Sequence, residues 1–374
     1  MILCIHTAIQ YSMAKDSSPS DEVVRVIRLR LKDKHAAILR EKSFWANQVW
    51  NYCNELSYKV WQRERHFMSG FDFAKYTKGA SKAGVPLHSQ TIQAISEEFA
   101  VRRKQFKKVK LRWRVSKGSR RSLGWIPFKA SALQYRNGQL KMSGIDAPLS
   151  LWDSYGLSQY ALGAGSIAED ARGRWYINIT VKVKKTVSTA TKMIGIDLGL
   201  KEFAAFSDGK KEDCQQFYRL AEHRLAVAQR AKKKKLTRAI HAKIKNRRKD
   251  YQHKLSTALV EQSGAIFIGN VNASGLAKTT MAKSVLDAGW SQFRTMLNYK
   301  CIGAGVWFEE VNEAYSTQDC SVCKTRSGPK GLKDLGIREW TCKECGTHHD
   351  RDVNAARNIL RRGRATLAVG IPVV

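Results

Sequence analysis

Residues 320–323 read CSVC, residues 342–345 read CKEC and residues 349–359 read HDRDVNAARNI, and these segments decide the fold of the C-terminal third. Two Cys-x-x-Cys pairs at this separation predict a small ribbon whose thiolates close a tetrahedral site around one structural Zn²⁺. The expected zinc ligands are Cys320, Cys323, Cys342 and Cys345. The third segment puts Asp352 at the opening of a helix just beyond the zinc site. A zinc ribbon that holds a carboxylate in place points towards a nuclease.

The composition points to a polyanionic partner. The chain has 374 residues, with 66 Lys and Arg against 32 Asp and Glu, which gives a formal net charge of +34. Repulsion among so many positive side chains is tolerated when the usual partner is a polyanion. Ten Trp and twelve Tyr provide flat surfaces on which unpaired bases can stack. A membrane surface is the rival polyanion, but no apolar run approaches the length of a spanning helix. We therefore expect the binding partner to be a nucleic acid.

The other cysteines lack any spacing pattern, which indicates a reducing compartment rather than a disulfide framework. They are Cys4, Cys53, Cys214 and Cys301. Residues 1–21 are expected to be a dispensable, disordered leader, because regular patterning begins only near Glu22. The sequence leaves open whether the chain starts at Met1 or Met13.

The N-terminal half predicts a β-barrel with a helical insertion. Residues 23–31 alternate apolar and basic side chains, as in a half-buried strand, and short strands joined by turns are expected at residues 125–128, 132–135, 139–142 and 175–183. Between them, residues 34–66 and 89–107 carry apolar positions at helical spacing. We assign residues 22–33 and 108–185 to the barrel and residues 34–107 to the helical domain.

The C-terminal half predicts a ribonuclease H-like α/β domain. After linker-like residues 186–192, the expected order is strand, strand, helix or helical hairpin over 212–262, strand, helix, strand and a terminal helix. We assign residues 193–314 and 348–362 to this domain. The remaining assignments are residues 315–347, the inserted zinc ribbon, and residues 363–374, a C-terminal tail.

Two acids are the first candidates for metal-dependent chemistry. Phosphodiester cleavage by two Mg²⁺ ions needs carboxylates that converge from separate elements. Asp197 ends an apolar strand, in Gly-Ile-Asp-Leu-Gly, and Asp352 opens the terminal helix. Taken singly, Asp197 fits a turn residue and Asp352 fits an acid at a helix N-terminus. Together with the zinc ligands, the two acids favour a catalytic site.

Two basic segments are the candidate nucleic-acid contacts. In the first, Trp113 can stack on a base, and core packing is the alternative. We expect the second to contact the phosphate backbone, which positions a ligand without reading its sequence, and a solvated face is the alternative there. The first set is Arg112, Trp113, Arg114, Arg120 and Arg121. The second set is Lys232, Lys233, Lys234, Lys235, Arg247, Arg248 and Lys249.

From residue 193 to about 362 the chain resembles the TnpB family, the RNA-guided nucleases of bacterial insertion sequences, which are related to type V CRISPR effectors and Fanzor proteins. The matching segments are 195–199, 253–254, 315–323, 340–346 and 350–359. The resemblance implies a RuvC-like nuclease domain that uses Mg²⁺. It also implies a wedge-like N-terminal barrel and a helical recognition domain that bind a guide RNA and read a short motif beside the double-stranded DNA target. The expected location is the nucleoid of a prokaryotic cytoplasm.

One position departs from the family pattern. The middle strand of such domains usually ends in a catalytic Glu, but here it ends in Gly269, which cannot bind a metal. The neighbouring strand runs into three acids, and a carboxylate there can reach the same metals across one strand spacing of about 5 Å. We rank Glu313 first as the replacement, because it closes that run, Glu310 second and Glu309 third. The alternative is that none of the three binds metal.

The predicted function is therefore an RNA-guided DNA endonuclease encoded by a transposable element. A nuclease-dead, RNA-guided DNA-binding repressor is the first alternative, and it predicts target binding without cleavage. A compact type V CRISPR effector would differ in genomic context, and a zinc-ribbon protein without a guide leaves Asp197 and Asp352 unexplained. The target, the adjacent motif, the guide and the oligomeric state are not encoded in any pattern found in the sequence.

Overall fold

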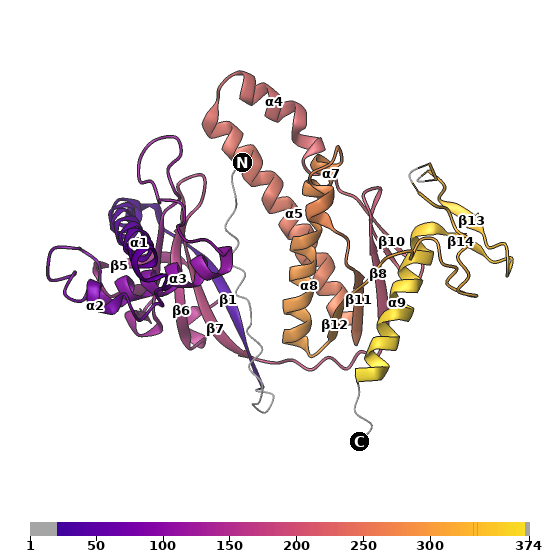
Figure 1. Ribbon diagram of the computed structural model, residues 1–374, viewed down its shortest axis with the longest axis horizontal. Coiled ribbons are helices and arrows are strands. Elements are labelled where there is room, and N and C mark those ends of the chain that lie inside the picture. Colours follow the sequence, from indigo (N-terminus) through magenta and orange to yellow (C-terminus); the bar gives the residue numbers. More distant parts are fainter. Residues whose placement is uncertain (1–20, 332, 335, 371–374) are drawn as a thin grey trace.

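The computed structural model describes residues 21–331, 333–334 and 336–370. The predicted leader lies outside these residues except for Asp21, so neither its disorder nor the choice of start codon is tested. The described chain forms two lobes, each built on its own β-sheet (Figure 1).

The N-terminal lobe contains a seven-stranded sheet in the order β2-β6-β7-β1-β5-β4-β3. Its strands are β1 (Glu22–Leu31), β2 (Trp125–Phe128), β3 (Leu133–Arg136), β4 (Gln139–Met142), β5 (Ile145–Trp152), β6 (Leu162–Glu169) and β7 (Trp175–Lys184). Strand β1 pairs antiparallel with β7 along most of its length and with β5 at its end. It buries Val23, Ile27, Leu29 and Leu31 and turns Arg28 outwards, as its alternation predicts, whereas Arg25 is exposed although it lies on the same side as the buried residues. Closure into a barrel stays a prediction.

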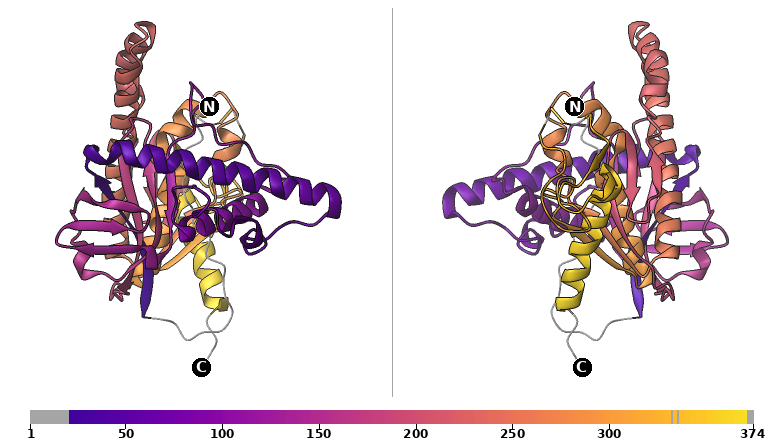
Figure 2. Two further views of the ribbon diagram at one scale, coloured as in Figure 1. Left: turned by 90° about the vertical axis from the view of Figure 1, so that its left-hand side faces the viewer. Right: turned by 90° about the vertical axis from the view of Figure 1, so that its right-hand side faces the viewer.

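Helices cover one side of this sheet, and their core is separate from the sheet's own. They are α1 (Ala36–Glu64), α2 (Ala74–Thr77) and α3 (Ser89–Phe106). Trp50 of α1 packs edge-on against Phe99 of α3, with ring centroids 5.3 Å apart. Figure 2 shows the long α1 extending beyond the rest of the lobe. The two main predicted helices are therefore present, and α1 ends at Glu64.

The second lobe contains a five-stranded sheet in the order β10-β9-β8-β11-β12. Its strands are β8 (Met193–Leu198), β9 (Glu202–Phe206), β10 (Lys211–Asp213), β11 (Ala265–Gly269) and β12 (Trp307–Val311). The β8, β11 and β12 strands are parallel, and β9 is antiparallel to β8. This order of elements is the one predicted for a ribonuclease H-like domain, with the short β10 as an addition.

Helices lie on both faces of this sheet. They are α4 (Glu222–Arg230), α5 (Lys234–Gln262), α6 (Ala273–Leu276), α7 (Ala282–Ala288), α8 (Trp290–Ala304) and α9 (Arg351–Gly370). Ile266 and Ile268 of β11 share one core with α5, α7 and α8, while Phe267 faces the opposite core beside Ile359 of α9. The α4–α5 pair forms the predicted helical hairpin, and it projects away from the body of the molecule (Figure 2). No helix of the described chain is long and apolar enough to cross a membrane.

Close packing brings α9 onto the sheet. A Cβ atom at Gly195 of β8 would lie 2.2 Å from the carbonyl oxygen of Ala356, and one at Gly363 would lie 2.0 Å from the ring of Phe267. Only glycine allows backbone and ring to approach this closely. The helix extends to Gly370, through part of the segment predicted as a tail. Between β12 and α9, the hairpin of β13 (Glu339–Thr341) and β14 (His348–Asp350) carries the second cysteine motif, and the first lies in an earlier turn closed by the bridge between Asp319 and Arg326.

The linker is ordered along α8. The backbone N–H groups of Thr186 and Ser188 donate to the carbonyl oxygens of Gly303 and Ala304 at 3.1 and 2.8 Å. These hydrogen bonds attach the connection between the lobes to the end of one helix.

Candidate active site

Three parallel strands of the second lobe end at one edge of the sheet. In the ladder, Ile268 of β11 pairs with Ile196 of β8, and Gly269 pairs with Val311 of β12. Asp197 is one residue beyond Ile196, so it lies level with the end of β11. The carboxyl ends of parallel strands are a common place for ligand binding in α/β folds.

Asp352 reaches the same edge from the first turn of α9. Asp350 caps the N-terminus of the helix. Its Oδ1 accepts hydrogen bonds from the backbone N–H groups of Asp352 and Val353 at 3.1 and 3.0 Å. A carboxylate at this position satisfies the free N–H groups of a helix start. The close contact of Gly195 with Ala356 and Leu360, further along α9, then holds the helix against β8.

The three leading candidates converge. Burial raises the pKa of Asp197 well above its usual range, and the nearby charges of Glu313 and then Asp352 raise it further, while Arg351 opposes them. Burial also raises the pKa of the Glu313 carboxyl. Three carboxylates held together in this way repel one another unless a cation lies between them. Oxygen ligands of this kind suit Mg²⁺, so the residues present fit the metal.

Glu313 occupies the space that a side chain at residue 269 would need. A Cβ atom on Gly269 would lie 2.4 Å from Oε2 of Glu313 and 3.2 Å from Cδ1 of Ile359. The backbone N–H of Glu313 donates to Oδ1 of Asn270 at 3.3 Å, which ties its loop to the end of β11. The carboxylate of Glu313 therefore projects over the glycine that interrupts the family pattern.

The other two glutamates have different surroundings. Glu310 forms an ion pair with Arg294 at 3.0 Å, and its side chain is 46% exposed. Glu309 accepts a 3.4 Å hydrogen bond from the indole N–H of Trp307 on its own strand. Among the neighbouring charges, Glu313 has the largest effect on the pKa of Asp197, and neither Glu309 nor Glu310 is among the groups that shift it.

The four predicted zinc ligands form one cluster. Their Sγ atoms all lie within 4.8 Å of one another, as four thiolates around one metal require. Nε2 of His349 lies 3.0 Å from Sγ of Cys320, and its ring packs on Trp340. His348 points elsewhere and pairs with Glu339. The donor set fits Zn²⁺ with no fifth ligand needed. Cys53, Cys214 and Cys301 lie apart from this cluster, and Cys4 is outside the described residues.

Two amides that the sequence analysis did not interpret attach the cysteine cluster to the helix that carries Asp352. The Nδ2 groups of Asn354 and Asn358 each donate to the carbonyl oxygens of Ser316 and Asp319, at 2.6 to 3.2 Å. Oδ1 of Asn354 accepts from the N–H of Ser321 at 2.9 Å. Spacing of four residues puts both amides on one face of α9, so the helix that carries Asp352 also holds the first cysteine turn.

Two cations near Asp352 were also missed. The Nη1 of Arg338, which lies in the ribbon, is 3.4 Å from both carboxylate oxygens of Asp352. The ammonium of Lys211 on β10 donates to Oδ2 of Asp350 at 2.6 Å. Desolvation raises the pKa of Asp350, but the hydrogen bonds from Lys211 and Val353 outweigh it and lower that pKa below its usual range. No local sequence signal joins residues 211 and 350, because 139 positions separate them.

The comparisons identify the family. A protein of Streptomyces pristinaespiralis named "Putative RNA-guided DNA endonuclease" is 32% identical over 379 residues, covering 93% of this chain and 92% of that protein. The TnpB-like protein L79 of Acanthamoeba polyphaga mimivirus is 32% identical over 143 residues, covering 35% of this chain and 26% of that protein. The chain belongs to the TnpB family.

Other comparisons agree with membership of the TnpB family. The family model described as "Cas12f1-like, TNB domain" matches residues 290–359, and the one described as "Probable transposase" matches residues 176–280. Among solved structures, a chain of a Cas12f1–sgRNA–target DNA complex superposes with a TM-score of 0.59 at 11% identity, covering 91% of this chain and 99% of that one. This likeness shows a shared fold across both lobes.

The predicted nucleic-acid contacts of this TnpB-family chain divide into exposed and paired groups. Arg112, Trp113, Arg120, Lys232 to Lys235, Arg247 and Lys249 are exposed. Three guanidinium groups have protein partners instead. Arg121 pairs with Glu169 at 2.7 Å, and Arg248 pairs with the buried Asp287 at 2.7 Å. Arg114 donates from Nε to Oδ1 of Asn47 at 2.6 Å and from Nη2 to the carbonyl oxygen of Leu123 at 2.8 Å.

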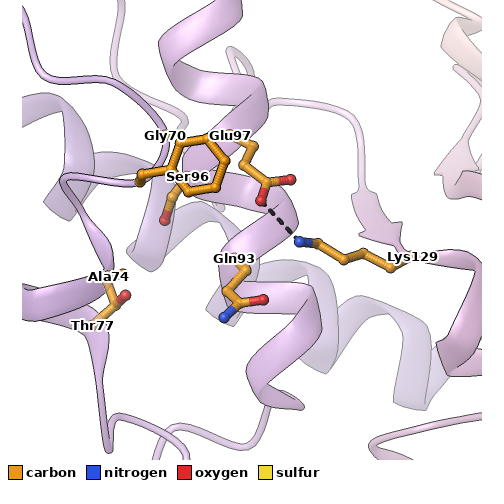
Figure 3. Close-up of a pocket in the computed structure, with 8 residues that line it drawn as sticks. Gly70, Ala74, Thr77, Gln93, Ser96, Glu97 and Lys129 are labelled. Atoms are coloured by element: carbon orange, nitrogen blue, oxygen red, sulfur yellow. Dashed lines mark hydrogen bonds and ion pairs between the residues drawn. The ribbon is translucent and has the colours of Figure 1, made fainter.

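A small pocket lies in the N-terminal lobe, between the loop at Gly70 and helix α3 (Figure 3). Its volume is about 100 Å³, and its residues include Phe71, Gln93 and Glu97. The Lys129 ammonium donates to Glu97 at 2.8 Å, the dashed contact in the figure. The pocket contains none of the three converging carboxylates, so it has no part in the candidate active site.

Proposed function

We propose that this chain is an RNA-guided DNA endonuclease encoded by a transposable element. The observation that carries the proposal is the convergence of Asp197, Glu313 and Asp352, in which both later acids act electrostatically on the first. The relative from Streptomyces pristinaespiralis, matched over nearly its whole length, supports the same function.

Asp197, Glu313 and Asp352 would hold Mg²⁺. When bound, Mg²⁺ lowers the pKa of attacking water and stabilises the leaving oxygen in phosphodiester hydrolysis. The protein's own contribution is to hold the three carboxylates in place before the metal arrives. Lys211 fixes Asp350 at the start of α9, and the packing of α9 on Gly195 fixes the helix against β8. Glu313 supplies the oxygen that Gly269 lacks, reaching over that glycine from beyond β12.

The zinc site would be structural. Four thiolates fill a tetrahedral zinc, which leaves no open position for water. The proposed role of the ribbon is to hold the start of α9 through Asn354 and Asn358, and so to keep Asp352 in the active site.

The partners we propose are a guide RNA and double-stranded target DNA. The formal charge of +34 supports binding through the phosphate backbone. We propose the wedge-like domain at residues 22–33 and 108–185, the recognition domain at residues 34–107 and the RuvC-like domain at residues 193–314 and 348–362. Guide pairing would then select the target, while the protein recognises the shape of the heteroduplex.

The deciding experiment is cleavage of a matched plasmid by the purified ribonucleoprotein with Mg²⁺. The wild-type protein is expected to cleave the plasmid, and Glu313→Gln is expected not to cleave it. Glu310→Gln is expected to cleave it, because Glu310 is paired with Arg294. Loss of cutting in Glu310→Gln alone would reassign the third carboxylate. Gly269 favours one other function, a guided DNA-binding repressor. Target binding by wild type without cutting in Mg²⁺ or Mn²⁺ would establish that function instead.

A further inference from the structure

A row of aromatic side chains lies along the C-terminal half of α1. We call Trp113, Tyr58, Trp61 and Phe67 the aromatic row. The rings of Tyr58 and Trp61 are stacked, with centroids 6.5 Å apart and an interplanar angle of 15°. Trp61 and Phe67 are stacked in the same way at 6.3 Å and 24°. The ring planes of Tyr58, Trp61 and Phe67 therefore lie in similar orientations.

Cations connect and cover these rings. The Lys110 ammonium lies 4.6 Å from the ring centroid of Tyr58 and 5.3 Å from that of Trp113, so it joins Trp113 to the rest of the row. The Arg65 guanidinium lies 4.4 Å from the Trp61 centroid. Glu55 is the acid paired with Lys110, at 2.7 Å.

The aromatic row is a surface feature. Phe67 and Trp113 are each 49% exposed, and Tyr58 and Trp61 are partly exposed. Within the described part of the chain, the apolar core of this lobe is built from other aromatic rings, such as Trp50, Phe73 and Phe99, and none of the row belongs to it. Exposed apolar rings in a row of this kind mark an interaction site.

The segment that carries Trp113 is held rigidly on α1. Nδ2 of Asn54 donates to the carbonyl oxygen of Leu111, and Oδ1 of Asn54 accepts from the Leu111 N–H, at 2.8 and 2.9 Å. Asn51 makes the same pair of bonds to Arg114, at 2.9 and 2.8 Å. These two amides, one helical turn apart, fix both ends of residues 111–114.

The side chains of the two end residues pack inwards, which turns the middle pair outwards. Leu111 is buried, and Arg114 is enclosed between Trp50 and Trp125, where desolvation lowers the pKa of its guanidinium to about 10. Arg112 and Trp113 between them are left exposed. The other end of the row is also fixed, because the buried Arg103 lies under Phe67 and donates to Ser57 and to the Met68 carbonyl.

We propose that the aromatic row binds an unpaired DNA strand by stacking its bases, with Lys110, Arg65 and Arg112 contacting phosphates. Rings can stack only on bases whose faces are free, so a duplex does not fit. Resting on the proposed function, the strand is the one displaced when the guide pairs with its target. Stacking is tolerant of sequence, because every base has a π face.

The test is binding of a fluorescein-labelled oligothymidine to the full-length chain loaded with its RNA, in the absence of divalent metal. Trp113→Ala and Phe67→Ala are each expected to weaken binding by at least about fivefold, the lower end of what one base–ring stack contributes. Trp113→Tyr should retain most of the affinity. Trp152→Ala is the matched control, because Trp152 is 47% exposed with the Arg30 guanidinium 4.7 Å from its ring, but lies on β5 outside the row.

The same variants are measured with a hairpin duplex and with the oligouridine equivalent. Unchanged affinity for oligothymidine in both alanine variants overturns the proposal, as does an equal loss for the duplex. A loss confined to oligouridine would assign the row to unpaired RNA and overturn the DNA assignment. The assay needs no cleavage and can be repeated on the chain without RNA, so its outcome is separate from that of the proposed nuclease function.

Discussion

Replacement of Gly269 by alanine should impair cleavage while leaving the fold intact. The added Cβ would lie 2.4 Å from Oε2 of Glu313, where ordinary contacts begin at 3.4 Å, so the carboxylate must move by about 1 Å. The displaced atom is the far end of a flexible side chain, and its Cβ is already at a normal 3.4 Å. The melting temperature should therefore change little. A displacement of about 1 Å in a catalytic group costs roughly 100-fold in rate.

The assay is single-turnover cleavage of a matched duplex by the ribonucleoprotein at saturating Mg²⁺. Gly336→Ala is the control, since nothing lies within 4 Å of a Cβ at that position. The exchange variant Gly269→Glu/Glu313→Gly should recover part of the lost activity, because it returns one carboxylate to the same space without a second one beside it. Cleavage at the wild-type rate by Gly269→Ala would refute the argument that Glu313 depends on the glycine.

Four further perturbations test the site and its supports. Asp352→Ala should abolish cleavage but retain guide-dependent target binding in a gel-shift assay, and residual cutting would count against its role as a ligand. Burial and like charges raise the pKa of Asp197, so metal-free stability should fall as pH rises through that pKa; Asp197→Asn should raise the Tm at pH 7 and flatten this dependence. Cys342→Ser should reduce zinc content in metal analysis, because three thiolates bind far more weakly than four. Lys211→Met should raise the Mg²⁺ concentration for half-maximal cleavage about tenfold, with the exposed Lys210→Met unchanged; equal values for the two would remove Lys211 from the support of α9.

Much of the architecture could be predicted from local patterns. The Cys-x-x-Cys spacing predicted the thiolate cluster, and the apolar strand before Asp197 predicted β8, because these signals lie within a few residues. Two strands of the N-terminal sheet were missed. Strand β5 contains Pro148, and β6 contains Gly163 and Gly165, residues that usually indicate turns or weak strands.

The surroundings of individual side chains depended on tertiary contacts, which local sequence patterns do not describe. The basic segment near Trp113 gave no indication that Arg114 is half-buried while Arg112 is exposed, since that difference is set by Asn51 and Asn54 some 60 positions earlier along the chain. In the same way, the position of the Glu313 carboxylate over Gly269 follows from the path of the loop after β12, which sequence periodicity does not describe.

Whether a relative has this fold and whether it cuts DNA are separate questions, and the two amides of α9 bear only on the first. Asn354 and Asn358 are part of the segment that marks this family, yet their hydrogen bonds go to the backbone of the first cysteine turn. A descendant that had lost cleavage would still need both amides to fold. Matches at Asn354 and Asn358 therefore report that a protein has this architecture. Whether it is a working nuclease or an inactive descendant is better judged from the side chains at positions 269 and 313, read as a pair.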